Sequence, residues 1–448
     1  MFRSFRSFNY RVWAIGALVS NIGGWMQATA QDWVVLTELT NNDATAMGIT
    51  MALQFGPPLV LVSFTGWVAD RFDRRNVLLV TQTVLMLLGL GIAVLLLSGL
   101  MTLPLMFCFA AAFGVANAFD APARQAFVSD MVSRDDTSNA VALNSASFNL
   151  ARLAGPAVSG ILIVLVGTGW VFVVNAATFL AMIVALLMIR REELMPSVHG
   201  TRRGGIAEGF RYVAKRGDLI TTFVVVFIVG AFGMNFPIYA STMALEFGRD
   251  ADGYGLLSSV LAIGSLAGAL LAARRARAKM RVVILSAGGF GVAAIIASFM
   301  PTYWLFATAL VFTGFSIVTM LTTANGYVQT TTDAAVRGRV LALYMAVIMG
   351  STPVGAPIAG WIVDTMGPRA ALLFGGVMAL VAFVIGMVWT LRSGRVHRTE
   401  KSRFRLTLDE TLPISVIRER DRDAERVGEV TSITTPLRLP EKSDRSGT

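Results

Sequence analysis

Four ionisable side chains stand within long apolar stretches of the chain, and their types could do chemistry there. They are Asp32, Asp120, Arg124 and Arg152, all in the first half of the sequence. Charged groups are rare inside membrane spans because burying them is costly, and those that occur are candidates for proton, ion or substrate movement. Carboxylates exchange protons and guanidinium groups hold carboxylates, so this set favours proton-linked transfer over covalent catalysis.

Asp120 and Arg152 are predicted to lie at similar depths in neighbouring spans. At a rise of about 1.5 Å per residue, Asp120 lies roughly 15 Å and Arg152 roughly 20 Å from one membrane surface. These depths predict an ion pair, for which Arg124 competes because it lies one turn from Asp120 on the same helical face. Two interpretations stay open: proton coupling through Asp120 when a partner moves away, or a permanent structural ion pair.

Asp32 is a second candidate for proton exchange, or for attracting a cationic substrate. It lies about twenty residues beyond Arg11, or roughly 30 Å along a helix. Polar and aromatic residues share its helical face or lie beside it: Asn21, Trp25, Gln27 and Gln31. Such a stripe is typical of a cavity wall, but an aspartate that simply reaches water at the membrane surface explains the position equally well.

Further cavity candidates are polar or aromatic residues of other apolar segments. They are Asn117, Asn149, Phe232, Asn235, Phe236, Tyr239, Thr319, Thr322, Asn325 and Gln329. Aromatic and amide groups together suit large, partly apolar ligands. Helix packing or lipid contact explains any one of the phenylalanines equally simply.

Membrane helices must position these residues, because the chain is too apolar for a soluble domain. Its 448 residues are 55% hydrophobic and only 15% charged, with a mean hydropathy of +0.64. About 20 apolar residues are needed to cross a hydrocarbon core of about 30 Å. Twelve stretches qualify: 12–37, 46–69, 76–98, 103–129, 139–166, 169–189, 219–243, 253–274, 281–299, 303–327, 338–363 and 369–391.

Basic residues gather in alternate loops. Those loops hold Arg71, Arg74 and Arg75, Arg134, the segments 190–216 and 274–281, and Arg337 with Arg339. The opposite loops hold only Arg249 and Arg369. The positive-inside rule therefore predicts a multi-pass protein of the bacterial cytoplasmic (inner) membrane with both termini in the cytoplasm. The same clustering argues that the net charge of +10 serves the lipid bilayer and not nucleic acid.

Several function classes have no support in the sequence. Cys108 is the only cysteine, and His199 and His397 both fall in polar segments, so we expect no disulfide, no metal centre and no cofactor. There is no G-x-x-x-x-G-K-[ST] phosphate loop and no catalytic dyad. An enzyme or an ATP-driven pump is therefore not expected.

A polar segment, 190–218, divides the chain into predicted six-helix bundles at 1–189 and 219–391. Within it, apolar residues of 205–216 recur at helical spacing, which predicts an amphipathic helix on the inner membrane surface; an unstructured basic linker is the alternative. Residues 392–448 are rich in charged and hydroxyl side chains, so we expect a disordered cytoplasmic tail.

The two halves resemble repeats. A constant offset of 200 maps several small or apolar residues of the fifth span onto the eleventh: Ala142, Leu143, Ala146, Gly155 and Gly160 onto Ala342, Leu343, Ala346, Gly355 and Gly360. Gly114 maps onto Gly314 in the same way. Duplicated halves with a binding site between them are typical of secondary transporters.

The stretch from Gly66 to Arg75 joins two apolar segments and reads Gly-Trp-Val-Ala-Asp-Arg-Phe-Asp-Arg-Arg. It resembles the G-x-x-x-D-[RK]-x-G-[RK]-[RK] loop of major facilitator superfamily transporters, with Asp73 in place of the second glycine. The resemblance implies an all-α membrane protein with twelve transmembrane helices in two pseudo-symmetric six-helix bundles. It also implies alternating access to a central site.

In transporters of this type the loop aspartate, here Asp70, holds the cytoplasmic side closed. It would do so by meeting the positive N-terminus of the eleventh span near Gly338. Glycines such as Gly66 would let helices approach closely. Asp73 adopts some turn conformations less readily than the glycine it replaces.

The arginines of this loop belong to the same predicted gate. Arg74 lies at helical spacing from Asp70 and could pair with Asp130 at the end of the fourth span. The alternative is that Arg71, Arg74 and Arg75 serve only as topology signals.

Other stretches resemble one branch of the superfamily, which includes the enterobactin exporter and related drug efflux proteins. They are 140–145, 149–156 with Gly160, 209–213 and 338–341. Gly155, Pro156 and Gly160 resemble a motif associated with antiporters, in which proline kinks the helix. The resemblance implies a monomeric secondary exporter of drug-like or siderophore-like small molecules in exchange for protons. The alternatives are a nutrient importer and a non-transporting receptor or scaffold of the same fold.

Overall fold

The computed structural model describes residues 3–133, 136–195, 206–275, 277–392, 396–398 and 406–408. The first half of its helical part contains six long helices: α1 (Phe8–Trp33), α2 (Ala44–Arg71), α3 (Arg74–Leu97), α4 (Leu103–Asp130), α5 (Thr137–Val166) and α6 (Thr168–Met188). Short turns flank them: η1 (Arg3–Arg6), the π-helical η2 (Val34–Glu38) and η3 (Arg191–Glu193). The all-α membrane fold predicted from the sequence is confirmed.

The second half repeats this order after the short helix α7 (Ile206–Ala214). A broken first span consists of α8 (Gly217–Ile228), the π-helical η4 (Val229–Gly233) and α9 (Phe236–Glu246). Five continuous helices follow: α10 (Ala251–Ala273), α11 (Met280–Ser298), α12 (Tyr303–Thr331), α13 (Arg337–Met366) and α14 (Pro368–Arg392).

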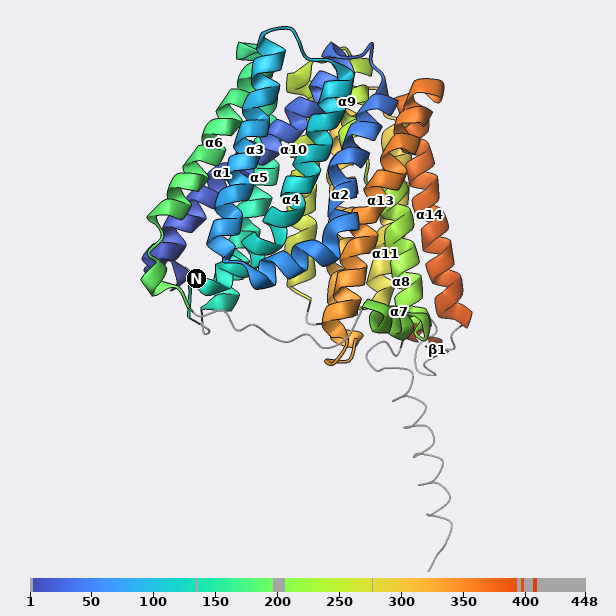
Figure 1. The fold of residues 1–448 in the computed structure, drawn as a ribbon. Coiled ribbons are helices and arrows are strands. Elements are labelled where there is room, and N and C mark those ends of the chain that lie inside the picture. Colours follow the sequence, from blue (N-terminus) through green and yellow to red (C-terminus); the bar gives the residue numbers. More distant parts are fainter. Residues whose placement is uncertain are drawn as a thin grey trace, which may run out of the picture. The chain divides into compact units, whose positions relative to one another are not determined.

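Eleven helical segments of the described residues are long and apolar enough to cross a membrane. The segment α1 is not one of them, because amide and carboxyl side chains lower its hydropathy, yet it packs between α5 and α6 and completes the set of twelve. Figure 1 shows α1 beginning and α14 ending at the same end of the helical part. We call this the basic end, since the α2–α3 loop with Arg71 and Arg74 lies there, and we call the other the opposite end.

The repeat predicted from the offset of 200 extends to the helix boundaries. Helix α5 spans Thr137–Val166 and α13 spans Arg337–Met366, each 30 residues long. Both end at a glycine with a φ of 88°, Gly167 and Gly367, where a side chain would be strained. The two halves therefore use the same local chemistry to stop corresponding helices.

Two crossing pairs join the halves, α2 with α13 and α5 with α10. In Figure 1 the upper part of α2 runs beside α13, and its lower part turns away toward α3. Pro57 and Pro58 lie inside α2 and remove backbone hydrogen bonds, which accounts for the bend.

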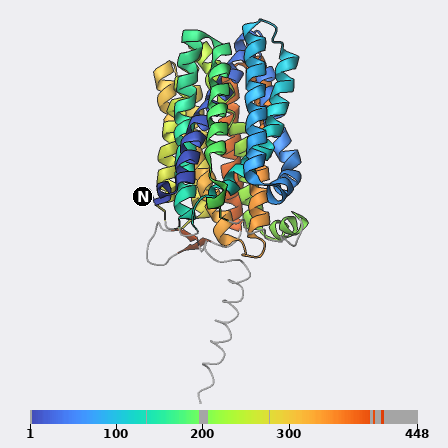
Figure 2. The same ribbon diagram turned by 60° about the vertical axis from the view of Figure 1, so that its left-hand side comes forward.

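Helix α7 lies crosswise at the basic end (Figure 2) and packs on α13. The segment beyond the helical part forms a separate unit, in which β1 (Val396–Arg398) pairs antiparallel with β2 (Leu406–Leu408). The remainder of the predicted disordered tail lies outside the described residues.

Candidate functional site

The Asp120 carboxylate is the centre of a buried polar cluster in the first half. Its Oδ1 accepts hydrogen bonds from Thr81 Oγ1 at 2.8 Å and Gln82 Nε2 at 2.7 Å, and its Oδ2 accepts one from Arg124 Nε at 2.9 Å. Asp120 is only 4% exposed. Helices α3 and α4 thus hold this carboxylate with three donors, one of them cationic, which is how buried charges are normally stabilised.

Arg152 does not join this cluster, and the predicted ion pair between Asp120 and Arg152 is wrong. The guanidinium of Arg152 lies 5.8 Å from the ring centre of Trp25 on α1, a cation–π contact. No ion pair to Arg152 exists among the described residues. Depth along a helix fixes the height of a side chain but not its direction, and Arg152 points toward α1 instead of α4.

A second set of buried amides lies between α1 and α6. Gln27 accepts a hydrogen bond from the Asn175 amide, and Thr178 Oγ1 donates to Asn175 Oδ1 at 2.9 Å. Ser20 on α1 contacts Gln82 on α3, which links this helix to the Asp120 cluster. Ser20 and Gln27 of α1 therefore face neighbouring helices of the bundle instead of lipid.

Asp32 lies at the opposite end of α1 and meets the second half of the molecule. It is 7% exposed, and its Oδ2 accepts a hydrogen bond from the Tyr254 hydroxyl of α10 at 3.1 Å. The ring of Trp33 stacks on that of Tyr254 with centroids 6.1 Å apart. Among the described residues Asp32 has no cationic partner, so this carboxyl is held by one neutral donor.

The α2–α3 loop carries three arginines that make different contacts. Arg74 Nη1 lies 2.7 Å from Asp130 Oδ1, so the structure brings together the pair expected from helical spacing. Arg75 Nε donates to the Leu186 carbonyl at 2.7 Å, and Arg71 lies over the ring of Trp67. These contacts tie α3 to α4 and α6, which a pure topology signal would not require.

Asp73, the departure from the family pattern, is the N-cap of α3. Its side chain accepts a hydrogen bond from the Asn76 amide at 2.9 Å, and its φ is −58°, which any residue adopts. The substitution therefore supplies a cap at no backbone cost. The side chain of Asp70 lies outside the described residues, so its predicted gating contact stays a prediction.

Glycines predicted to bring helices together behave differently. A Cβ atom at Gly155 would lie 2.5 Å from Trp25 Cβ, and one at Gly160 would lie 2.6 Å from the Ala251 carbonyl oxygen. Gly66, in contrast, has open space around it, so the expectation of close helix approach at Gly66 is wrong for this conformation. Pro156 lies inside the continuous helix α5, and its carbonyl oxygen faces Gly255 of α10.

The cavity candidates separate into two groups by exposure. Six are buried, namely Gln27, Gln31, Asn235, Phe236, Tyr239 and Thr319. The rest are partly or fully exposed, namely Asn21, Trp25, Asn117, Asn149, Phe232, Thr322, Asn325 and Gln329. Among the buried ones, both side-chain polar atoms of Gln31 and Oδ1 of Asn235 have no hydrogen-bond partner in the described part of the chain, whereas the Tyr239 hydroxyl donates to the Phe232 carbonyl at 2.8 Å.

Helices α2 and α13 touch closely at the opposite end of the helical part. Near the basic end, two glycines of these helices make no such contact. A Cβ at Gly48 would lie 2.3 Å from the Ala356 carbonyl oxygen, and one at Gly360 would lie 2.2 Å from that of Ala44. Toward the basic end, Gly66 of α2 and Gly338 of α13 have nothing within 4 Å. Among the described residues, close contacts between the two helices extend from the opposite end to Leu59 and Gly350 near their middle, whereas the positions at Gly66 and Gly338 are open.

Sequence comparison identifies the family. The profile described as "Transmembrane secretion effector", a group of the major facilitator superfamily, matches residues 1–415. The chain belongs to this family. Its relatives include the staphyloferrin A transporter of Staphylococcus aureus, 22% identical over 350 residues that cover 77% of this chain and 87% of the relative.

Two exporters also resemble this major facilitator protein. The multidrug efflux pump Tap of Mycolicibacterium fortuitum is 26% identical and covers 83% of this chain and 92% of the relative. The enterobactin exporter EntS of Shigella flexneri is 23% identical, over 82% of this chain and 88% of the relative. The family and these relatives are transporters, so the protein is a transporter and not an enzyme.

Solved transporters share the fold. The D-xylose–proton symporter superposes with a TM-score of 0.68 at 13% identity, over 84% of this chain and 97% of the other. The nucleoside transporter NupG gives a TM-score of 0.67 at 13% identity, over 85% of this chain and 98% of the NupG chain. At such identity these structures support the major facilitator fold alone.

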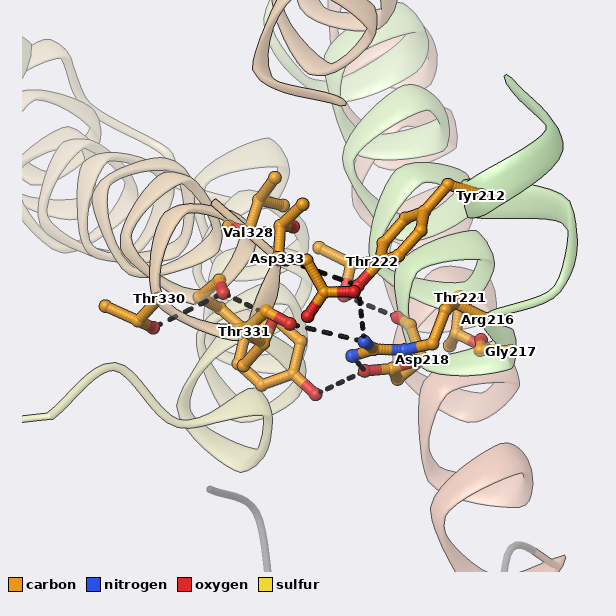
Figure 3. Close-up of polar contacts among 12 residues, drawn as sticks. Tyr212, Arg216, Gly217, Asp218, Thr221, Thr222, Val328, Thr330, Thr331 and Asp333 are labelled. Atoms are coloured by element: carbon orange, nitrogen blue, oxygen red, sulfur yellow. Dashed lines mark hydrogen bonds and ion pairs between the residues drawn. The ribbon is translucent and has the colours of Figure 1, made fainter. Parts of the chain in front are cut away.

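Two polar sites of this transporter had no counterpart in the sequence predictions. The first joins α7, α8 and α12: Arg216 forms two hydrogen bonds with Asp218, at 2.8 and 2.6 Å, and donates to Tyr212 at 3.1 Å and to the Thr331 carbonyl at 3.2 Å (Figure 3). Tyr327 donates to the same carboxylate at 2.9 Å. The sequence signal was an Arg-x-Asp pair at the start of an apolar span.

Arg216 stays firmly cationic in this cluster. Burial by itself lowers the pKa of Arg216, but the hydrogen bonds and the charge of Asp218 outweigh burial and raise that pKa above its ordinary value. Asp218 is fully buried, so the two groups depend on each other. The cluster fastens the linker helix α7 to the second half.

The second missed residue is Asp364, near the end of α13. Its two carboxylate oxygens accept hydrogen bonds from the backbone amides of Ala44 and Thr45, both at 2.8 Å. These amides begin α2, so the contact crosses between the halves. Nothing in the local sequence marks Asp364, because its partners lie in the other half of the chain.

Proposed function

We propose that this transporter exports small molecules across the bacterial cytoplasmic membrane by alternating access, in exchange for protons. The basic end faces the cytoplasm in this proposal, in keeping with the positive-inside rule, and both termini lie there. The opposite end then faces outward. The exporters among its relatives support the direction.

The uneven packing of α2 against α13 carries the proposal. Close contacts at Gly48 and Gly360 seal the outer end, whereas Gly66 and Gly338 have open space at the cytoplasmic end. A protein that had only to hold its halves together would pack this helix pair along its whole length. Close contact toward one end is the arrangement expected of one state of a rocking transporter.

Asp32 is our leading candidate for proton exchange. It lies within the sealed outer end, where it contacts Tyr254 of the other half, so separation of the halves would expose it to the outer solution. It lacks the counter-charge that Asp120 has in Arg124. Desolvation of an unpaired carboxylate is costly, and proton binding relieves that cost when the end closes.

Arg152 and Trp25 are the leading candidates for holding cargo. An arginine with no acidic partner, stacked beside an indole, suits an amphipathic molecule that carries an acidic group close to an aromatic or apolar one. The names of the relatives include siderophores as well as drugs. We therefore propose that anionic amphipathic compounds are exported in preference to cations.

Inverted membrane vesicles with an acid interior test this function. Ethidium, erythromycin and enterobactin are added in turn while the lumenal pH is followed, and we expect proton loss with at least one of them. Asp32→Asn should abolish that proton loss, whereas Asp250→Asn, an exposed carboxylate at the same end, should leave it unchanged. Arg152→Gln should weaken the response to enterobactin more than the response to ethidium.

The alternatives predict other results. A nutrient importer would move its substrate out of the vesicle lumen together with protons, and a receptor or scaffold would give no proton movement with any compound. Proton exchange that survives Asp32→Asn but is lost in Asp120→Asn would transfer the coupling role to Asp120.

A further inference from the structure

We propose that Asp364 is the gating residue of the outer end, where it latches α13 onto the N-terminus of α2. This proposal rests on the alternating access proposed above and adds a second gate to it. The gate expected for Asp70 closes the cytoplasmic end. The gate at Asp364 would close the outer end, and the same two helices would carry both.

The geometry at Asp364 is that of a helix cap supplied from another helix. Oδ1 accepts the Ala44 amide at 2.8 Å, and Oδ2 accepts the Thr45 amide at 2.8 Å and the Thr45 hydroxyl at 2.5 Å. The next amide, that of Ala46, is bonded by Asp43, the ordinary N-cap of α2. Two carboxylates therefore satisfy the first three amides of α2, and both face its positive end.

This contact is suited to break and form in every transport cycle. Asp364 is exposed and Thr45 is partly exposed, so water can replace their hydrogen bonds when the halves separate. The crossing beside it, at Gly48 and Gly360, is a close contact of one helix with the backbone of the other. The carboxylate adds a specific polar contact, with an energy small enough to be reversed.

The cytoplasmic end of the same pair shows the complementary arrangement. Helix α13 begins there, and its N-cap Val336 supplies no side-chain hydrogen bond. Open space lies beside Gly338, where Asp70 of α2 is expected to dock. Since α2 and α13 run antiparallel, each has an aspartate near its C-terminus that can cap the N-terminus of the other.

The other crossing pair lacks this device. The residue of α5 that corresponds to Asp364 by the offset of 200 is Val164. The N-cap of α10 is Asp250, whose side chain makes no cap hydrogen bond, and α10 meets α5 through Gly160 and Gly255. One neutral hydrogen bond, from Ser259 Oγ to the Leu153 carbonyl at 3.0 Å, joins α10 to α5. The charged end contact therefore belongs to α2 and α13, whereas α5 and α10 meet through close glycine packing and this neutral bond.

Spin-label distances measured by double electron–electron resonance test the latch without any substrate. In a Cys108→Ser background, one label pair at Leu100→Cys and Phe299→Cys reports on the outer end. A second pair at Phe72→Cys and Ala335→Cys reports on the cytoplasmic end. All four positions are exposed loop residues.

We expect Asp364→Asn and Asp364→Ala to raise the ratio of outward-open to outward-closed molecules about fivefold, the size of effect that loss of a charged cap gives. Asp70→Asn should shift the ratio the other way, and combining Asp70→Asn with Asp364→Asn should bring it back toward the unsubstituted value. Asp250→Asn is the matched control and should change neither distance.

Unchanged outer-end distances in both Asp364 variants, with Asp70→Asn still effective, would overturn the latch. So would a double variant that matches Asp70→Asn alone. The result is independent of export: vesicles without transport activity contradict the proposed function, whereas these distances report only on the gate.

Discussion

Asp120 is surrounded by three hydrogen-bond donors, whereas Asp32 has one. Thr81, Gln82 and Arg124 all donate to the Asp120 carboxylate, and they come from the same half of the molecule. Rocking of the halves does not separate these groups. The contacts therefore favour the structural interpretation of Asp120, and the contact of Asp32 with the other half favours its role in coupling.

We therefore expect Asp120→Asn to lower the stability of the folded protein. The change leaves Arg124 as a buried cation without its partner, since the side chains of Arg124 and Asp120 are only 15% and 6% exposed. Loss of one member of a buried pair costs about 3–5 kcal/mol, so the midpoint of thermal unfolding in detergent should fall clearly.

The control is the exposed pair Arg190 and Glu193, for which Glu193→Gln should change stability by no more than about 0.5 kcal/mol. The double variant Asp120→Asn with Arg124→Gln should recover most of the lost stability. An unaltered unfolding midpoint in Asp120→Asn, together with lost proton movement, would instead identify Asp120 as the coupling residue.

Single-residue contacts could be predicted from the sequence only in part. The spacing of the α2–α3 loop gave the approach of Arg74 to Asp130, because both lie at helix ends whose positions the loop fixes. The same reasoning failed for Arg152, since residue counting gives depth but not rotation about the helix axis. Asp364 could not be found at all, because its partner Ala44 is 320 residues away in sequence.

Helices and their repeats were easier to predict than contacts. Hydropathy alone located the long helices, and the offset of 200 related the fifth span to the eleventh. The predicted bounds of these spans, 139–166 and 338–363, differ in length, whereas the structure gives α5 and α13 equal lengths. Hydropathy and repeats did not predict which end of the α2–α13 pair is in contact in this conformation. Gly66 was expected at a close helix contact but has open space around it. In the proposed transport cycle that contact would form only when the cytoplasmic end closes, and one sequence would serve both states.

Helix α7 offers a test at this level. Its attachment depends on Arg216, which bridges Tyr212 of α7 and the buried Asp218 of α8. Arg216→Gln should detach the helix, and backbone hydrogen exchange across 208–214 should quicken by at least about tenfold, in line with the cost of breaking a buried charge pair.

Lys215→Gln, a change at the exposed neighbouring residue, should leave the exchange rates unaltered. Arg216→Lys should be intermediate, because lysine keeps the charge but lacks the planar fork that bonds both carboxylate oxygens. Slow exchange retained in Arg216→Gln would mean that the contacts of α7 with α13, which include the pair of Glu208 and Arg339, are sufficient to hold it.

In the proposed alternating-access cycle, the whole molecule can rock only if the contacts at its outer end separate. A polar latch at Asp364, glycine crossings at Gly48 and Gly360, and the contact of Asp32 with Tyr254 all lie at the outer end. The proposed cycle moves the two halves as rigid bodies, so a covalent bond at one of these points should immobilise the entire transporter. No residue of the cargo site need be altered to achieve this.

Thr45→Cys with Asp364→Cys, in the Cys108→Ser background, is the appropriate pair, since the two side chains are in contact and neither is buried. A short bifunctional reagent that joins the two thiols should stop export of the compound that the vesicle assay identifies as a substrate. If the linker of the reagent contains a disulfide, a reductant cleaves the linker and should restore export. The matched control is Ser98→Cys with Thr102→Cys, two exposed positions within one half, where the same reagent should have no effect. The opposite result is unchanged export after the two introduced thiols are completely cross-linked. That result would show that the outer contacts do not open during transport. It would exclude alternating access by separation of α2 from α13.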